Sequence, residues 1–98
     1  MAEFTIDATE QGVSQKTLTA NTVDTITFTD DSPDGVEILN EGSVGISGTT
    51  NGDDPTVGGE DTFYVPPNSV RVIDLSPTGE TEVKLISSGT PKYSVSKA

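Results

Sequence analysis

One short stretch of oxygen-bearing side chains could bind a cation. Asp30, Ser32, Asp34 and Glu41 match positions 1, 3, 5 and 12 of a calcium-binding EF-hand loop, and Gly35 takes the turn position between them. Carboxylate and hydroxyl oxygens are the hard ligands that Ca²⁺ prefers in proteins. The spacing therefore raises the hypothesis of a calcium site, although the match is weak.

The sequence around this stretch favours an ordinary turn. An EF-hand loop lies between two helices, whereas both flanks here alternate as strands do. Glu37 stands where an apolar residue is usual, and Pro33 restricts the loop. Asn51 to Asp54 offer similar oxygens, but Asn, Gly and Asp are what any turn contains. We therefore expect turns that expose acids to water, and no metal or other cofactor.

The chain lacks two residue types on which many catalytic sites depend. The 98 residues include no His and no Cys, which excludes a Ser-His-Asp triad, a thiol nucleophile and a cysteine-based metal site. With 16 Asp and Glu residues, some carboxylates must lie close together by chance. A glycosidase needs such a pair in a cleft, and a domain of this size rarely encloses one. The sequence predicts a protein that is not an enzyme and has no catalytic residues.

The charge of the chain is strongly acidic and unevenly distributed. The formal net charge is −11, and no cation stands between Lys16 and Arg71. After Glu82 the chain carries three lysines and no further acid. Such a chain repels phosphate backbones and anionic membrane surfaces. Its longest apolar runs are also far too short to span a bilayer. We therefore expect neither nucleic acid nor membrane among its partners.

Short alternating segments rich in Thr, Val and Ile recur between Gly, Pro, Asn and Asp, which is typical of an all-β protein. The expected strands are Phe4–Asp7, Lys16–Ala20, Thr22–Thr29, Val36–Asn40, Val44–Gly48, Thr62–Val65, Val70–Leu75, Glu82–Ser87 and Lys92–Ser96. The expected inward pairs are Ile26 with Phe28, Val36 with Ile38, Val44 with Ile46, Val83 with Leu85, and Tyr93 with Val95. One apolar face per strand predicts an Ig-like antiparallel β-sandwich of about seven to nine strands.

The connections carry predictions of their own. Pro66-Pro67 cannot continue a central strand and is expected to mark a crossover between sheets. Asn51-Gly52 is the best dipeptide for a hairpin turn, and Asn51–Asp61 is expected to be an exposed loop. We predict residues 1–11 as an N-terminal arm or edge strand, and residues 12–98 as one domain with a short C-terminal tail.

A few side chains are candidates for contact with a partner. Phe63 and Tyr64 are adjacent on one strand and must face opposite sides, so one of them could reach a partner surface or lie beneath the neighbouring loop. Phe4, Lys92 and Lys97 lie in the terminal segments, which often become ordered on a neighbouring subunit. Two lysines at a chain end are, however, usually solvated.

Two stretches resemble known families. Val44–Thr56 resembles a hairpin of Ig-like accessory modules found in some bacterial glycosidases, with Asn51-Gly52 in place of the usual Asp-Gly. Val83–Val95, together with Thr22–Phe28 and Asp53–Pro66, looks like small tailed-phage virion proteins, many of them from actinobacterial phages. These resemble head decoration proteins. The likeness extends from about Thr17 onward and brings no catalytic residues with it.

This resemblance implies a structural protein of the virion, made in the host cytoplasm and placed on the outer surface of an icosahedral capsid. The implied partner is the phage major capsid protein, whose subunits it would bridge. A homotrimer on local threefold axes is the first expectation, and a single copy at each hexamer centre is the alternative. The competing hypothesis is an Ig-like carbohydrate- or partner-binding module of a tail or cell-wall protein. The absence of Trp counts against sugar binding.

Overall fold

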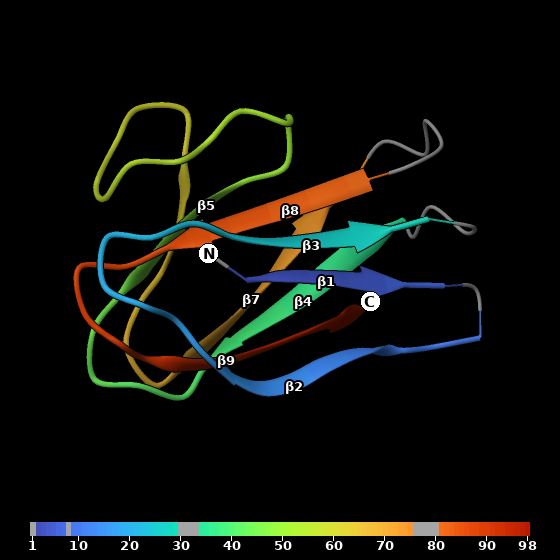
Figure 1. The fold of residues 1–98 in the computed structure, drawn as a ribbon, viewed down its shortest axis with the longest axis horizontal. Helices are drawn as coiled ribbons and strands as arrows, with labels where there is room; N and C mark the ends of the chain where they lie inside the picture. The colour runs from blue at the N-terminus through green and yellow to red at the C-terminus, as the bar shows by residue number, and fades with distance from the viewer. Residues whose placement is uncertain (1, 8, 30–33, 76–80) are drawn as a thin grey trace.

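The computed structural model describes residues 2–7, 9–29, 34–75 and 81–98 (Figure 1). Within these ranges the chain forms nine strands and no helix. The first five strands are β1 (Glu3–Ile6), β2 (Gly12–Thr17), β3 (Asp24–Phe28), β4 (Gly35–Asn40) and β5 (Ile46–Thr49). The last four are β6 (Phe63–Val65), β7 (Ser69–Asp74), β8 (Thr81–Ile86) and β9 (Lys92–Lys97). In the described part of the chain, no helix is long and apolar enough to cross a membrane.

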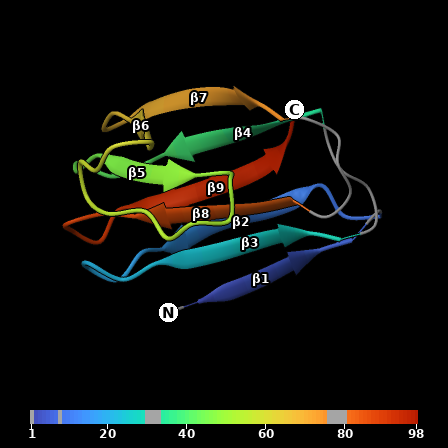
Figure 2. The ribbon, with the colours of Figure 1, turned by 90° about the horizontal axis from the view of Figure 1, so that it is seen from above.

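The strands form two sheets that pack face to face. Sheet A has the order β1-β3-β8-β5-β6, and sheet B has the order β2-β9-β4-β7. In Figure 2, β1 lies at one side of the sandwich and β6 and β7 at the other. All pairings are antiparallel except that of β1 with β3, which run parallel. The predicted all-β sandwich is confirmed, with this one parallel pair as a difference.

The chain changes sheets at almost every connection. Among the strands of the described residues, only β5 and β6 are consecutive in the chain and in the same sheet. Pro66-Pro67 follows the end of β6 in sheet A, and β7 begins in sheet B two residues later, so the predicted crossover is confirmed. Asn51-Gly52 does form a turn, in which Gly52 has a φ of 88°. It does not close a tight hairpin, because β6 begins only at Phe63.

The core fills the space between the two sheets. Its central side chains have no exposed surface, and they are Ile26, Phe28, Val36, Ile38, Ile46, Val65, Val83, Leu85, Tyr93 and Val95. The predicted inward pairs are therefore confirmed except for Val44, which is half-buried and precedes β5. Burial of each large aliphatic side chain contributes about 1.5–3 kcal/mol before the entropy of ordering the chain is subtracted.

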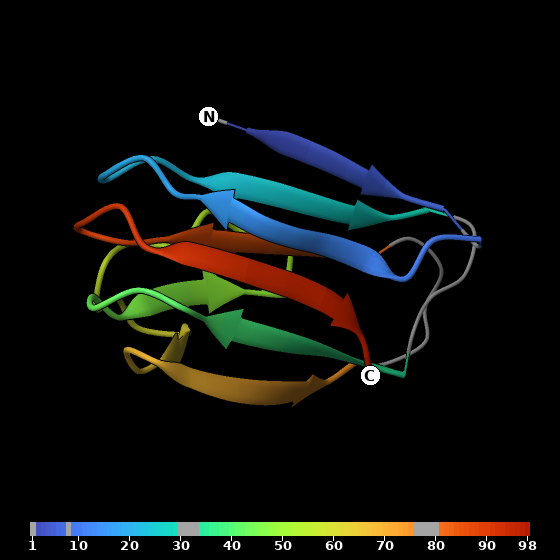
Figure 3. The ribbon, with the colours of Figure 1, turned by 90° about the horizontal axis from the view of Figure 1, so that it is seen from below.

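The two ends of the described chain are both part of the sandwich. β1 is an edge strand of sheet A, whereas β9 lies inside sheet B between β2 and β4 (Figure 3). Only Ala98 follows β9. The segment Lys92–Lys97 is therefore part of the folded sandwich, which agrees with the predicted strand Lys92–Ser96. The physical reason is that Tyr93 and Val95 alternate into the core, so releasing this segment would expose both of them.

Candidate interaction surface

The residues predicted to contact a partner do not gather on one surface. Phe4 is on β1 and Tyr64 is on β6, and these are the two opposite edges of sheet A. With strands about 4.8 Å apart, the two backbones are separated by roughly 19 Å. Phe4 is half-buried against the core, and the Lys16 ammonium lies 5.0 Å from the centre of its ring. Phe4 therefore serves packing and a cation–π contact within the chain.

Phe63 and Tyr64 face opposite sides of sheet A, as their adjacency requires. Phe63 packs against the core above Gly48, where an added Cβ would lie 2.4 Å from the end of its ring. Tyr64 faces outward, with half of its surface exposed. Its ring covers the backbone at Gly45, where a Cβ would meet the ring at a comparably short distance. Two glycines thus make room for the two rings, and Tyr64 is the one available to a partner.

Lys92 and Lys97 lie at opposite ends of β9. Lys92 is exposed and lines an open depression of about 220 Å³, together with Glu41 and Pro91. The Lys97 ammonium donates a hydrogen bond to the backbone carbonyl of Asp7 at 3.2 Å. This bond ties the end of β9 to the connection between β1 and β2. Of the two lysines, Lys92 is the one whose surroundings are open to a partner.

The acids of the EF-hand-like motif are not brought together. Asp30 and Ser32 lie outside the described residues. Asp34 and Glu41 flank the six residues of β4, one at each end. An extended strand of that length separates them by roughly 20 Å, too far to share one ion. Within the described ranges no group of three or more acids could hold a metal ion.

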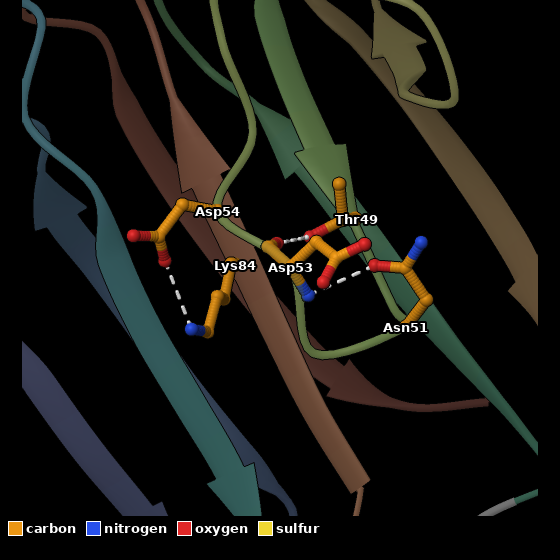
Figure 4. A network of polar contacts seen from close by, with 5 residues as sticks. All are labelled: Thr49, Asn51, Asp53, Asp54 and Lys84. Atoms are coloured by element: carbon orange, nitrogen blue, oxygen red, sulfur yellow. Dashed lines mark hydrogen bonds and ion pairs between the residues drawn. The ribbon is translucent and has the colours of Figure 1, made fainter.

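The loop of residues 50–62 folds back over the outer face of sheet A. Thr49 Oγ1 donates a hydrogen bond to the carbonyl of Asp53, and the Asn51 side chain accepts one from the Asp53 amide at 3.0 Å (Figure 4). The Gly58 amide donates to Ser47 Oγ at 3.1 Å. These bonds hold the loop against β5, which explains why Ser47 and Thr49 are buried although they point away from the core.

An ion pair adds a further contact between this loop and the sheet. Lys84 Nζ, on β8, lies 2.9 Å from Asp54 Oδ1 (Figure 4). The hydrogen bond that Lys84 donates to Asp54 raises the pKa of the ammonium above its usual value. Because the Asp54 side chain is 73% exposed, water screens the pair and its net contribution is small.

A buried polar contact links the two sheets across the core. The Tyr93 hydroxyl, from sheet B, donates a 2.8 Å hydrogen bond to Asp24 Oδ2, from sheet A. The other carboxylate oxygen of Asp24 accepts from the Ala2 amide at 3.1 Å. Burial, and then this hydrogen bond, raise the pKa of Tyr93 far above its usual value. The pair is satisfied and closed to solvent, so its role is to fix the packing of the sheets.

The outer face of sheet B carries exposed apolar side chains beside one edge. Leu39 of β4 is opposite Val70 of β7, and Val72 is two residues further along β7 on the same face. Their exposed fractions are 37%, 54% and 54%. We call these three residues the β4–β7 surface. Because these exposed apolar side chains are contiguous rather than scattered singly, they form a candidate contact surface.

Sequence reasoning missed this surface because β7 is apolar on both faces. Val70 and Val72 share one face, and Ile73 shares the other with Arg71. The structure turns Arg71 and Ile73 to the side of the core-facing residues of β4, since they pair with Ile38 and Val36. The available signal was this double-sided apolar character, which is unusual for a strand with one buried face.

Comparison with known proteins supports the fold. No protein-family model and no curated protein matches the chain. Among solved structures, the chain is similar to Aeromonas hydrophila PliG, a periplasmic lysozyme inhibitor of g-type lysozyme. The TM-score is 0.60 at 10% identity, covering 97% of this chain and 96% of that one. It is less similar to the pre-peptidase C-terminal domain of a Bacillus anthracis collagenase, with a TM-score of 0.48 at 16% identity and coverage of 96% and 92%. At these identities the likeness concerns the fold alone.

Proposed function

We propose that this protein is a non-enzymatic virion protein that binds the outer surface of an icosahedral phage capsid. Its partner is the major capsid protein, and its role is to bridge neighbouring capsid subunits as a decoration or cement protein. The proposal rests on the sequence resemblance to small tailed-phage head proteins. It also rests on one structural observation, the exposed β4–β7 surface of an otherwise acidic sandwich.

The β4–β7 surface suits attachment better than catalysis. Leu39, Val70 and Val72 provide apolar area that contributes free energy when a partner covers it. Each bridge buries interface that must be exposed again before the shell opens, which is how binding stabilises an assembly. The net charge of −11 favours a capsid patch with positive potential, keeps the free protein soluble and discourages contact with the genome.

Co-sedimentation with undecorated phage heads tests this function. We expect saturable binding, and the copy number per head distinguishes a trimer on threefold axes from one copy at each hexamer centre. Wild-type protein that stays in the supernatant at all concentrations would refute the proposal.

A matched pair of substitutions locates the contact. Val72→Lys should weaken binding to heads at least about tenfold, because it places a charge within the β4–β7 surface. The control is Val57→Lys, at a residue that is similarly exposed (47%) but lies on the loop over sheet A. The control should bind as the wild type does. Equal binding by the two variants would place the contact elsewhere.

A carbohydrate- or partner-binding module of a tail or cell-wall protein is the second candidate. The half-exposed ring of Tyr64 favours it, since planar aromatic rings stack on sugars. A glycan array tests this alternative directly. Glycan binding that Tyr64→Ala abolishes, together with no affinity for heads, would select it.

A further inference from the structure

The four edges of the two sheets differ in how they are protected against strand pairing. β6 has three residues and is followed by two prolines, and β1 has four residues. β2 is longer, but its pairing with β9 shifts register between Val13 and Lys16, and Gln15 has a φ of 53°. Short strands, prolines, bulges and charged side chains are devices that prevent an edge from pairing with another chain.

β7 is not short and has no proline and no bulge, although it carries the charged side chains Arg71 and Asp74. Its six residues pair with β4 in one continuous register from Ser69 to Asp74, with no proline and no bulge. Among the described residues its pairing is with β4 alone, and it forms the outer border of sheet B in Figures 2 and 3. Among the described residues it is therefore the longest edge strand with one continuous register.

The register identifies which backbone groups of β7 face outward. The Leu75 amide donates to the Asp34 carbonyl at 2.8 Å. Every second residue from Leu75 back, namely Ile73, Arg71 and Ser69, therefore directs its N–H and C=O groups toward β4. The alternate residues, Val70, Val72 and Asp74, then direct their N–H and C=O groups away from the sheet. These are the groups that an added strand would bond, and two of them belong to the β4–β7 surface.

We propose that β7 accepts an antiparallel strand from the partner, so that sheet B grows by one strand on binding. This inference rests on the proposed function and states how the capsid contact is made. The incoming segment is extended, with β-branched residues opposite Val70 and Val72 and a lysine or arginine opposite Asp74. Pairing is antiparallel because every pairing of sheet B is antiparallel.

Charge favours a partner strand over a second copy of β7. When two copies of β7 pair antiparallel, side chains of the same face lie opposite each other only if one residue pairs with its own equivalent at the centre. Centring on Arg71 places two guanidinium groups opposite each other, and centring on Val72 places Asp74 opposite Val70. Each chain also carries a net charge of −11, which opposes self-association. A segment with a cation opposite Asp74 has neither problem.

Amide hydrogen exchange of the full chain tests the pairing directly. The probe is a disulfide-closed hairpin peptide whose free strand reads Lys-Thr-Val-Thr-Val, which places Lys opposite Asp74 and the valines opposite Val72 and Val70. Its closed form reduces the entropy lost on binding. We expect the peptide to slow exchange at Val70, Val72 and Asp74 at least about tenfold, with little change at Arg71 and Ile73, which already bond to β4. The Glu-Thr-Val-Thr-Val hairpin should protect them less.

The second measurement uses Val72→Pro, which removes an outward N–H while keeping an apolar side chain and the bonds to β4. It should bind heads at least about tenfold more weakly than wild type. The control is Thr17→Pro on β2, whose N–H also points away from its sheet because its neighbour Leu18 bonds to the Pro91 carbonyl. Circular dichroism melting must show both variants folded.

The two measurements test strand addition and capsid binding separately. Protection of the three amides with loss of head binding in Val72→Pro supports strand addition. Wild-type protein that binds heads while Val72→Pro binds equally well, or peptide that leaves the amides unprotected, overturns it and leaves the proposed function intact. Protection that appears without peptide and increases with protein concentration assigns the edge to a second copy and also overturns it. Wild-type protein that ignores heads refutes the proposed function, whatever the peptide does.

Discussion

The outer faces of the two sheets are built from similar strands but differ in whether a loop of the chain covers them. On sheet A, the chain covers its own face with the loop of residues 50–62, which is held at Ser47, Thr49 and Lys84. On sheet B, no described segment covers Leu39, Val70 and Val72, which lie beside or on the edge strand β7. The contrast shows that a returning loop determines how much of each outer face stays open to solvent. Three of the five exposed large apolar side chains of the described residues lie together on sheet B, and the other two, Val57 and Tyr64, lie on the sheet A side.

The largest expected effect separates residues that hold the fold from those that face outward. Ile38→Ala should lower the free energy of unfolding by about 2–5 kcal/mol, because Ile38 is fully buried and its truncation leaves a cavity in the core. Leu39→Ala is the matched control on the same strand and should cost less, about 1 kcal/mol, because Leu39 is only partly buried. Urea denaturation measures both. Equal losses would mean that Leu39 is part of the core and that the β4–β7 surface is wrongly assigned.

A smaller loss is expected from the polar contact that joins the two sheets. Tyr93→Phe removes the donor to Asp24 and leaves a buried carboxylate oxygen without that partner, at a cost of about 1–3 kcal/mol. The substitution keeps the ring and therefore most of the packing. Thermal unfolding followed by circular dichroism measures the change. An unchanged melting temperature would show that packing alone joins the sheets.

The smallest effect concerns the covered face. Asp54→Asn removes the ion pair with Lys84 and should cost less than about 1 kcal/mol. Because the pKa of Lys84 is raised in the folded state, the pair contributes fully below the unfolded pKa of lysine. Its contribution is lost as the pH rises through the folded pKa. The stability difference between wild type and Asp54→Asn should therefore disappear in strongly alkaline solution. A difference that persists there would show that Asp54 acts through the shape of the loop.

Much of the fold was predictable because it depends on local patterns. The inward pairs Ile26–Phe28 and Val83–Leu85 follow from alternation, and the Pro66-Pro67 crossover follows from the chemistry of proline. The parallel pairing of β1 with β3 could not be predicted, since alternation within a strand does not identify its neighbour. The EF-hand-like spacing was misleading for a related reason. It assumes a curled loop, whereas β4 extends between Asp34 and Glu41.

By itself, the sequence determined the all-β class, most of the core residues, the turn and crossover positions, and the acidic charge that disfavours nucleic acid as a partner. These properties depend on residue type and on the alternation of side chains between the two faces of a strand, and both can be read from the chain itself. Only the tertiary structure decided which edge is left open. β7 has apolar residues on both faces, so the choice between Val72 and Ile73 depends on its register with β4, where Ile73 is placed beside the buried Val36. That pairing, and not the sequence of β7 alone, leaves Val70 and Val72 exposed.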